Sequence, residues 1–144
     1  SVILMHMQGD PQTMQDNPIY NVPSCDIRDY LDRRVAACIA AGVEAHLIAV
    51  DPGIGFGKTV EHNLEILANM DCLHELGCPV VLGASRKSFI GRLSGAKGPH
   101  HRVPGSIAAA LAARAKGVQI FRVHDVGAMR QALDIWEAVD AVGD

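Results

Sequence analysis

Four short apolar runs, each followed by a segment long enough for a helix, constrain this chain more than any other feature of its sequence. The runs are rich in valine, isoleucine and leucine and read as buried strands. Because strands separated by whole helices cannot form hairpins, they must run parallel, with right-handed crossovers. The sequence therefore predicts an α/β fold of four consecutive strand–helix units, with strands at 2–5, 47–50, 80–82 and 118–123.

The segments between these runs have the apolar spacing of helices, most clearly at 27–39 and 129–139. Asp26, Ser106 and Asp125 each precede such a segment and have side chains that can accept a hydrogen bond from a helix-start N–H. We expect helices to begin at these residues, and the alanine-rich helix after Ser106 to stop at Gly117.

Composition limits the classes of protein that fit. The 144 residues are 49% hydrophobic and 20% charged, which predicts one globular domain over 1–144. The net charge of −3 gives no basic surface for a nucleic acid or a membrane, so neither is expected as a partner. The four cysteines are expected to be free thiols, and the spacing of the histidines favours no protein-bound metal. Residues 1–8 lack the pattern of a signal peptide, so we expect a cytoplasmic protein.

Four strand–helix units are half of the eight that form a (β/α)₈ barrel. A (β/α)₈ barrel takes about 250 residues, whereas this chain supplies four units and starts inside a strand. Four parallel strands alone would leave two long unpaired edges, which proteins usually cover or close. We therefore expect half of a barrel, completed by an amino-terminal half or by a partner chain.

Polar or glycine-containing clusters follow all four predicted strands. They begin at His6, Asp51, Gly83 and Arg122. Carboxyl ends of parallel strands meet at one edge of the sheet, where α/β proteins bind their ligands. The sequence therefore predicts a ligand site at that edge.

The glycine-rich segment after Asp51 fits neither common nucleotide motif. A Walker A loop would need glycine at Pro52, and a dinucleotide fingerprint would need glycine at Lys58. A plain strand-to-helix turn remains the alternative, but it leaves the carboxylate of Asp51 unexplained directly after an apolar strand, where desolvation is costly. We interpret Asp51 as a ligand-binding residue.

Basic residues at two neighbouring strand ends predict an anion site. The run Ser85-Arg86-Lys87-Ser88 combines hydroxyls, cations and helix-start N–H groups, and alternation along the next strand sends Arg122 and His124 to one side. The alternatives are a capped surface helix with solvated cations and a structural histidine. Two such ends together favour a phosphate-bearing ligand.

The motifs 4–9, 51–58, 83–88, 105–106 and 122–126, in this order and spacing, resemble the carboxyl-terminal half of dihydropteroate synthase, barrel units 5 to 8. The resemblance implies a pterin-binding transferase of folate biosynthesis, a class that sulfonamides target. Such an enzyme condenses 7,8-dihydropterin-6-ylmethyl pyrophosphate with 4-aminobenzoate, giving 7,8-dihydropteroate and pyrophosphate. It also implies Mg²⁺, bound mainly through the substrate pyrophosphate and the absent half, and a homodimer formed through the last two helices.

The resemblance also assigns roles to particular residues. Lys87, Arg122 and His124 are implied to be catalytic. The pterin would contact Met5, Asp51, Phe56, Gly83, Lys87 and Arg122, and the pyrophosphate and aminobenzoate would contact Ser85, Arg86, Ser88, Arg122 and His124.

Two alternatives stay open. A methyltetrahydrofolate methyltransferase is another pterin-binding barrel and would also use Asp51, but it has no pyrophosphate to hold, so the basic clusters count against it. A catalytically silent half barrel would also fit, because the pocket residues of the earlier strands are absent. For this reason we expect little or no synthase activity from the chain alone.

Overall fold

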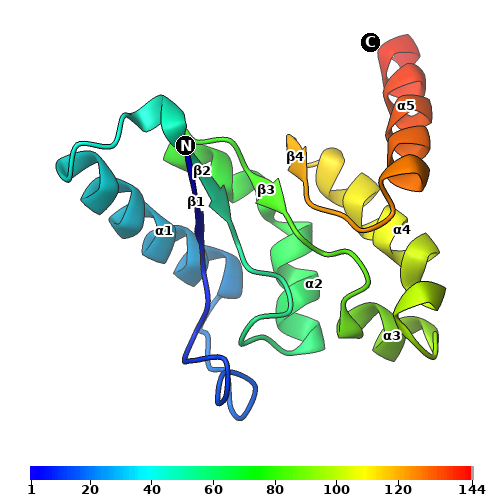
Figure 1. The fold of residues 1–144 in the computed structure, drawn as a ribbon, viewed down its shortest axis with the longest axis horizontal. Helices are drawn as coiled ribbons and strands as arrows, with labels where there is room; N and C mark the ends of the chain where they lie inside the picture. The colour runs from blue at the N-terminus through cyan, green and yellow to red at the C-terminus, as the bar shows by residue number, and fades with distance from the viewer. Residues whose placement is uncertain (144) are drawn as a thin grey trace.

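Parallel strands form the centre of the molecule, as the alternating sequence predicts. The computed structural model describes residues 1–143 and has an α/β fold (Figure 1). The strands are β1 (Val2–Met5), β2 (Ile48–Asp51), β3 (Val81–Leu82) and β4 (Ile120–Phe121), and the helices are α1 (Pro23–Ala40), α2 (Val60–Ala68), α3 (Ser88–Ser94), α4 (Val103–Arg114) and α5 (Val126–Gly143), with short 3-10 turns η1 (Ala45–Leu47), η2 (Met70–Leu76) and η3 (Pro99–Arg102).

The strands lie side by side in chain order. β1 pairs with β2 in parallel, with Met5 opposite Asp51, and β3 pairs with β4 in the same sense. A single parallel bridge between Val50 and Val80 joins the two pairs. Every strand therefore ends at the same edge.

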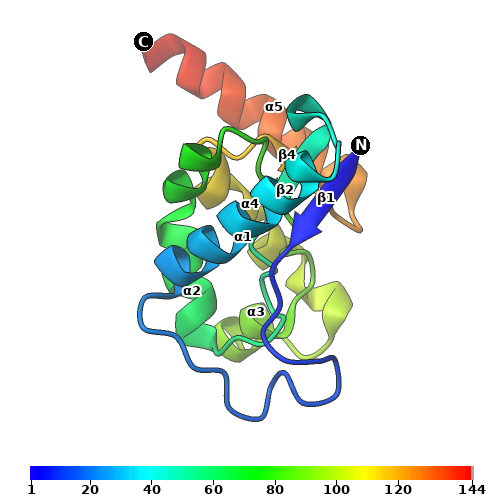
Figure 2. The same ribbon diagram turned by 90° about the vertical axis from the view of Figure 1, so that its left-hand side faces the viewer.

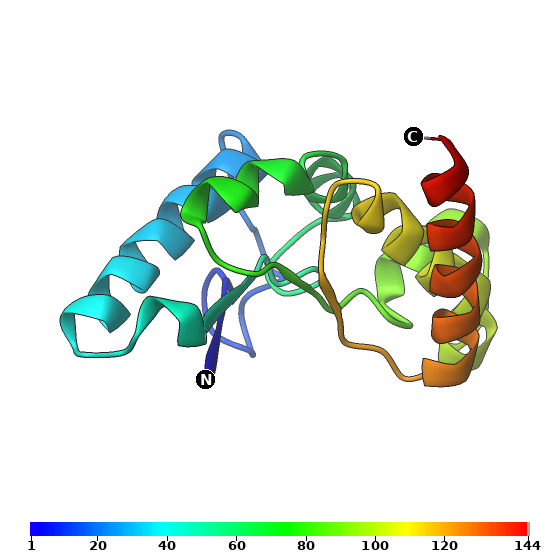
Figure 3. The same cartoon turned by 90° about the horizontal axis from the view of Figure 1, so that it is seen from above.

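The helices lie in an arc along one side of the strands. Seen from above, α1, α2, α4 and α5 follow one another around the strands, and within residues 1–143 no helix covers the opposite side (Figure 3). The segment between β1 and α1 loops out beyond the carboxyl end of β1 (Figure 2). The loops at the carboxyl ends thus border an open side.

The core fills the space between the arc of helices and the strands. Ile27 and Leu31 of α1, Val50 of β2 and Ile66 of α2 are fully or almost fully buried. Burial of each such side chain contributes about 1.5–3 kcal/mol. The unpaired edge of β1 is exposed instead, with Ile3 57% accessible.

Two predicted helix starts are wrong. α1 begins at Pro23, because proline is preset for the first helical turn, and the carboxylate of Asp26 instead accepts a hydrogen bond from the Asn21 N–H. α4 begins at Val103 and ends at Arg114, before Gly117; the Ser106 hydroxyl lies inside it and donates to the Arg102 carbonyl.

Other expectations are confirmed. α5 follows directly after Asp125, and all four cysteines are free. The predicted strands are correctly located, although the last is shorter than the run 118–123. None of the helices in the described part of the chain is long and apolar enough to cross a membrane.

Candidate active site

The carboxyl ends of β3 and β4 and the loop after β2 enclose a cavity of about 430 Å³. Seven of its eight lining residues carry a predicted role, and only Pro99 does not. The lining residues are Phe56, Gly83, Ser85, Arg86, Lys87, Pro99, Arg122 and His124. The expectation that these clusters gather at one edge of the sheet is confirmed.

Asp51 ends β2 beside this cavity and is only 3% exposed. Its Oδ1 accepts a hydrogen bond of 2.7 Å from the Gly53 N–H. Burial raises the pKa of the carboxyl, while the Gly53 N–H and the positive charges of Arg122 and Lys87 act in the opposite direction. A buried carboxylate with its second oxygen free of protein partners can accept hydrogen bonds from a ligand.

Lys87 and Phe56 form one wall of the cavity. The Lys87 Nζ lies 3.7 Å from the centroid of the Phe56 ring, a cation–π contact that fixes the direction of the amine. The Lys87 stem also runs past Gly55, where a Cβ would approach it to 3.0 Å. Burial and the neighbouring Arg122 charge lower the pKa of Lys87. The wall therefore offers an aromatic face and a directed cation.

Arg122 and His124 lie on the other wall. The Arg122 guanidinium packs on Gly83, so closely that a Cβ there would lie 2.6 Å from Nη2. The Ser85 hydroxyl lies 3.0 Å from His124 Nδ1 and accepts a hydrogen bond of 3.2 Å from the His124 backbone N–H. Strand β4 ends before both residues, yet both reach one cavity, as the predicted alternation requires.

Three predicted residues have different surroundings from the rest. Met5 ends β1 next to Asp51, outside the lining of the cavity. Ser88 begins α3 and lines a neighbouring cavity of about 250 Å³ together with Lys58 and Arg92. Arg86 lines the main cavity, but its guanidinium is paired with Asp125.

A buried pair beside the site was not predicted. His6 and Lys58 are 6% and 4% exposed, and the Lys58 amine lies 3.0 Å from His6 Nδ1 and donates to the Phe56 carbonyl at 2.9 Å. The amine thereby ties the loop after β2 to the end of β1. Burial lowers the pKa of Lys58 to about 7 and that of His6 to about 4. In the sequence, His6 opens one of the polar clusters and Lys58 closes the glycine-rich loop, but no pattern pairs the two residues.

The buried His6 predicts a loss of stability in acid. Its pKa of about 4 in the fold lies below its ordinary value of 6.5, so the unfolded chain binds the extra proton between these values. Stability is therefore complete above pH 6.5 and falls as pH drops toward 4. We expect the free energy of unfolding to fall by about 2 kcal/mol between pH 7 and pH 5 through this residue.

Urea unfolding at both pH values measures this effect. His6→Gln should remove that share of the pH dependence, while His46→Gln, at an exposed imidazole, should leave it intact. An equal pH dependence in His6→Gln and the unchanged chain would contradict the role of His6.

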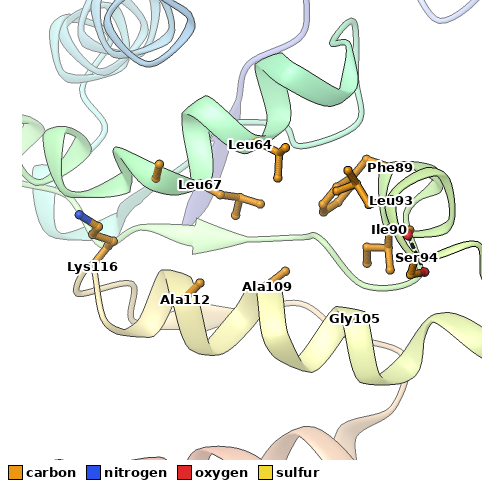
Figure 4. A pocket seen from close by; sticks show the side chains of 11 residues that line it. Leu64, Leu67, Phe89, Ile90, Leu93, Ser94, Gly105, Ala109, Ala112 and Lys116 are labelled. Atoms are coloured by element: carbon orange, nitrogen blue, oxygen red, sulfur yellow. Dashed lines mark hydrogen bonds between the residues drawn. The ribbon is translucent and has the colours of Figure 1, made fainter.

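A second cavity of about 430 Å³ lies on the helical side, between α2, α3 and α4 (Figure 4). Leu64, Leu67, Leu93 and Ala109 line it, and the Ser94 hydroxyl there donates to the Ile90 carbonyl. Its lining is apolar except for Ser94 and Lys116, so it offers mainly surface for packing.

The cavity at the strand ends and the adjacent Asp51 therefore combine three capabilities. A buried carboxylate can accept hydrogen bonds, an aromatic ring and a lysine can hold a flat polar ring, and an arginine with a histidine can hold an anion. These groups suit a ligand that has a planar heterocycle at one end and a phosphate group at the other.

Comparison with known proteins agrees with this chemistry. The family model described as "Pterin binding enzyme" matches residues 1–124. Dihydropteroate synthase from Neisseria meningitidis serogroup B is 48% identical over 141 residues, covering 96% of this chain and 50% of that protein. The chain thus spans about half the length of the curated relatives it matches.

Solved structures give the same result. Dihydropteroate synthase of Yersinia pestis, in complex with a sulfonamide drug, superposes with a TM-score of 0.93 at 41% identity, over 97% of this chain and 51% of that one. The Xanthomonas albilineans enzyme in complex with 7,8-dihydropteroate gives a TM-score of 0.89 at 41% identity, over 96% and 50%.

Proposed function

The chain belongs to the pterin-binding enzyme family, and from this premise we propose that it supplies one half of a dihydropteroate synthase. Residues 1–144 would form a single domain, units 5 to 8 of a (β/α)₈ barrel. Parallel strands in chain order with helices along one side support this arrangement. The observation that carries the proposal is the single cavity shared by Phe56, Lys87, Arg122 and His124 beside the buried Asp51.

The pterin would bind between Asp51 and the wall formed by Lys87 and Phe56. The Asp51 carboxylate accepts hydrogen bonds from ring N–H groups, and the Lys87 amine donates to a ring acceptor. Met5 and Gly83 border this space, and Arg122 lies against Gly83. Burial of Asp51 excludes water and so strengthens these contacts.

The pyrophosphate would bind at Arg122 and His124, with Ser88 on the side that faces the neighbouring cavity. The reaction forms a bond between the amine nitrogen of 4-aminobenzoate and the pterin methylene carbon, and it breaks the bond from that carbon to the pyrophosphate oxygen. The electron pair of the broken bond leaves with pyrophosphate, and the proton lost by the amine passes to water or to the departing pyrophosphate. Negative charge develops on the leaving oxygen, where the Arg122 guanidinium stabilises it. The aminobenzoate would enter near Ser85 and Arg86.

Mg²⁺ belongs to this proposal only through the substrate. In the described part of the chain no three histidine, cysteine or carboxylate side chains gather at one point. Of the carboxylates at these strand ends, Asp125 is paired with Arg86 and Asp51 has one oxygen bonded to the Gly53 N–H, and the walls of the cavity are cationic. These residues do not make a Mg²⁺ site, so the ion would be held by pyrophosphate and by residues outside this chain.

Binding of pyrophosphate to the chain tests the proposal. Arg122 and His124 come from one strand end and need no residue from outside the chain, so we expect saturable binding by isothermal titration calorimetry, tighter than that of chloride at equal ionic strength. No binding of pyrophosphate would overturn the proposal. The methyltransferase alternative is disfavoured by the same two residues, because that reaction releases no pyrophosphate.

Gly83→Ala should weaken this binding without unfolding the chain. The new methyl group would lie 2.6 Å from Arg122 Nη2, and the flexible arginine tip must move away. We expect pyrophosphate affinity to fall about tenfold. Gly127→Ala in α5 is the matched control, because no atom lies within 4 Å of its added carbon. Equal affinities in the two variants would remove Arg122 from the anion site.

The proposal includes a homodimer formed through α4 and α5. Apolar side chains of α5 such as Ile135 and Val139 are 64% and 69% exposed, whereas Trp136 packs on the Arg114 guanidinium of its own chain. We expect analytical ultracentrifugation at high micromolar concentration to give twice the chain mass, and Val139→Asp to give a monomer. A monomeric unchanged chain would contradict this surface. The cytoplasmic location stays a prediction of the sequence.

A further inference from the structure

Arg86 has an unusual backbone conformation at the centre of the site. Its φ of 60° is the one positive value at a non-glycine residue in the described range 1–143. Side chains disfavour this left-handed region, and such residues persist where the surrounding structure holds them from several directions. The turn at Arg86 directs the chain from the end of β3 into Lys87 and α3.

Four hydrogen bonds hold Arg86 in place. Its backbone N–H donates to the Ser106 hydroxyl at 2.8 Å, and its carbonyl accepts from Arg102 Nη1 at 3.0 Å. Its guanidinium donates twice to Asp125, from Nε to Oδ2 at 2.9 Å and from Nη2 to Oδ1 at 2.6 Å. A bidentate pair of this kind fixes the direction as well as the distance of its partners.

Two consecutive contacts therefore join the two loops that carry the site. Ser85 contacts His124, and the next residue on each loop, Arg86 and Asp125, forms the bidentate pair. Lys87 follows immediately on one side. Relaxing the pair would free the turn that directs the Lys87 amine and the chain segment that carries His124.

We propose that Asp125 is a positioning residue, which through its bidentate pair with Arg86 holds Lys87 and His124 at one cavity. This inference rests on the proposed function. It assigns the Arg86 guanidinium to holding the two loops together, in place of direct contact with substrate. Both side chains are partly buried, at 20% and 25% exposed, and the bidentate geometry distinguishes the pair from an ordinary surface ion pair.

The direction in which Asp125→Asn changes pyrophosphate affinity shows whether Asp125 positions the site or acts only through its charge. Asp125 is an anion close to a predicted anion site, so its neutralisation would tighten pyrophosphate binding if charge alone mattered. If Asp125 positions the site, Asp125→Asn weakens binding instead. Asparagine also precedes helices readily, so the start of α5 is retained.

The experiment titrates pyrophosphate into the chain and its variants by calorimetry, well below the unfolding temperature of each. We expect Asp125→Asn and Arg86→Gln each to weaken binding about tenfold. The double variant has the net charge of the unchanged chain, and it should bind no more weakly than the worse single variant because one contact is lost in all three. Arg86→Lys keeps the positive charge but loses the bidentate guanidinium, so its pyrophosphate affinity should lie between that of the unchanged chain and that of Arg86→Gln.

A matched pair serves as the control. Arg130 and Asp134 form an exposed ion pair on α5, and their joint replacement by glutamine and asparagine should leave pyrophosphate affinity unchanged. Tighter or unchanged binding in Asp125→Asn, or unchanged binding in the double variant, would overturn this inference alone. If Asp125→Asn does not fold, Arg86→Lys with unchanged affinity would overturn it. Absence of binding by the unchanged chain would overturn the proposed function and this inference together.

Discussion

The chain alone is expected to form no dihydropteroate at a measurable rate, whereas a hybrid that adds the half of the Neisseria meningitidis enzyme it does not match should form it readily. In the proposed enzyme the four strands supply one side of the site, and within residues 1–143 no helix covers the side of the strands opposite the arc of helices. Misplaced or missing groups in a preorganised site cost catalysis by many orders of magnitude. Product formation, followed by chromatography with both substrates, measures the difference.

Two controls identify the source of activity in the hybrid. Replacement of Lys87 or Arg122 by alanine in the hybrid should abolish turnover, since both line the cavity. Circular dichroism and cooperative unfolding establish that each protein is folded. Turnover by the isolated chain near the rate of the hybrid, or a folded hybrid without turnover, would contradict the shared site.

Asp51→Asn is expected to weaken pterin binding in the hybrid by about ten- to a hundredfold, equivalent to about 1.5–3 kcal/mol for a charge-assisted hydrogen-bonded pair. The carboxylate is 3% exposed and accepts one hydrogen bond from Gly53, which leaves its second oxygen for ring donors. An asparagine amide presents donors where the pterin also has donors. Binding of 4-aminobenzoate should change little.

Equilibrium titration of a dihydropterin substrate analogue, monitored by calorimetry, gives the pterin affinity. Asp134→Asn, at an exposed carboxylate on α5, is the control and should bind the pterin as the unchanged hybrid does. Equal pterin affinities in Asp51→Asn and this control would remove Asp51 from the pterin site.

Much of the fold follows from patterns that the sequence displays directly. The apolar run at β1 predicts its strand without error, and the segment 129–139 with helical spacing lies inside α5. Errors arose where two local signals compete. Asp26 and Ser106 are good capping residues, but Pro23 and Pro104 lie upstream and favour earlier helix starts.

The candidate site was predictable from sequence insofar as the carboxyl ends of parallel strands meet at one edge of the sheet. Phe56, Lys87, Arg122 and His124 follow three different strands, and parallel pairing alone brings them to one edge. The contact between Lys58 and His6 was not predictable, because it depends on how closely the glycine loop packs on the end of β1. A Cβ at Gly53 would overlap the His6 carbonyl, a constraint that only the folded chain reveals.

The pair of Arg86 and Asp125 shows the same limit. Sequence places a cation and a carboxylate at neighbouring strand ends. It does not show that Arg86 turns with a φ of 60° and directs two of its three guanidinium nitrogens to one carboxylate. The backbone conformation at Arg86 therefore decides that this cation holds the loops together.

A crystal of the chain soaked in pyrophosphate shows directly whether Arg122 and His124 form an anion site. We expect density for pyrophosphate between Arg122 and His124, with the Arg122 guanidinium still packed on Gly83 and Arg86 still paired with Asp125. Ser88, at the start of α3, should lie on the side of the anion that faces the neighbouring cavity. Ordered Arg122 and His124 side chains that point apart, with pyrophosphate bound elsewhere, would contradict the account.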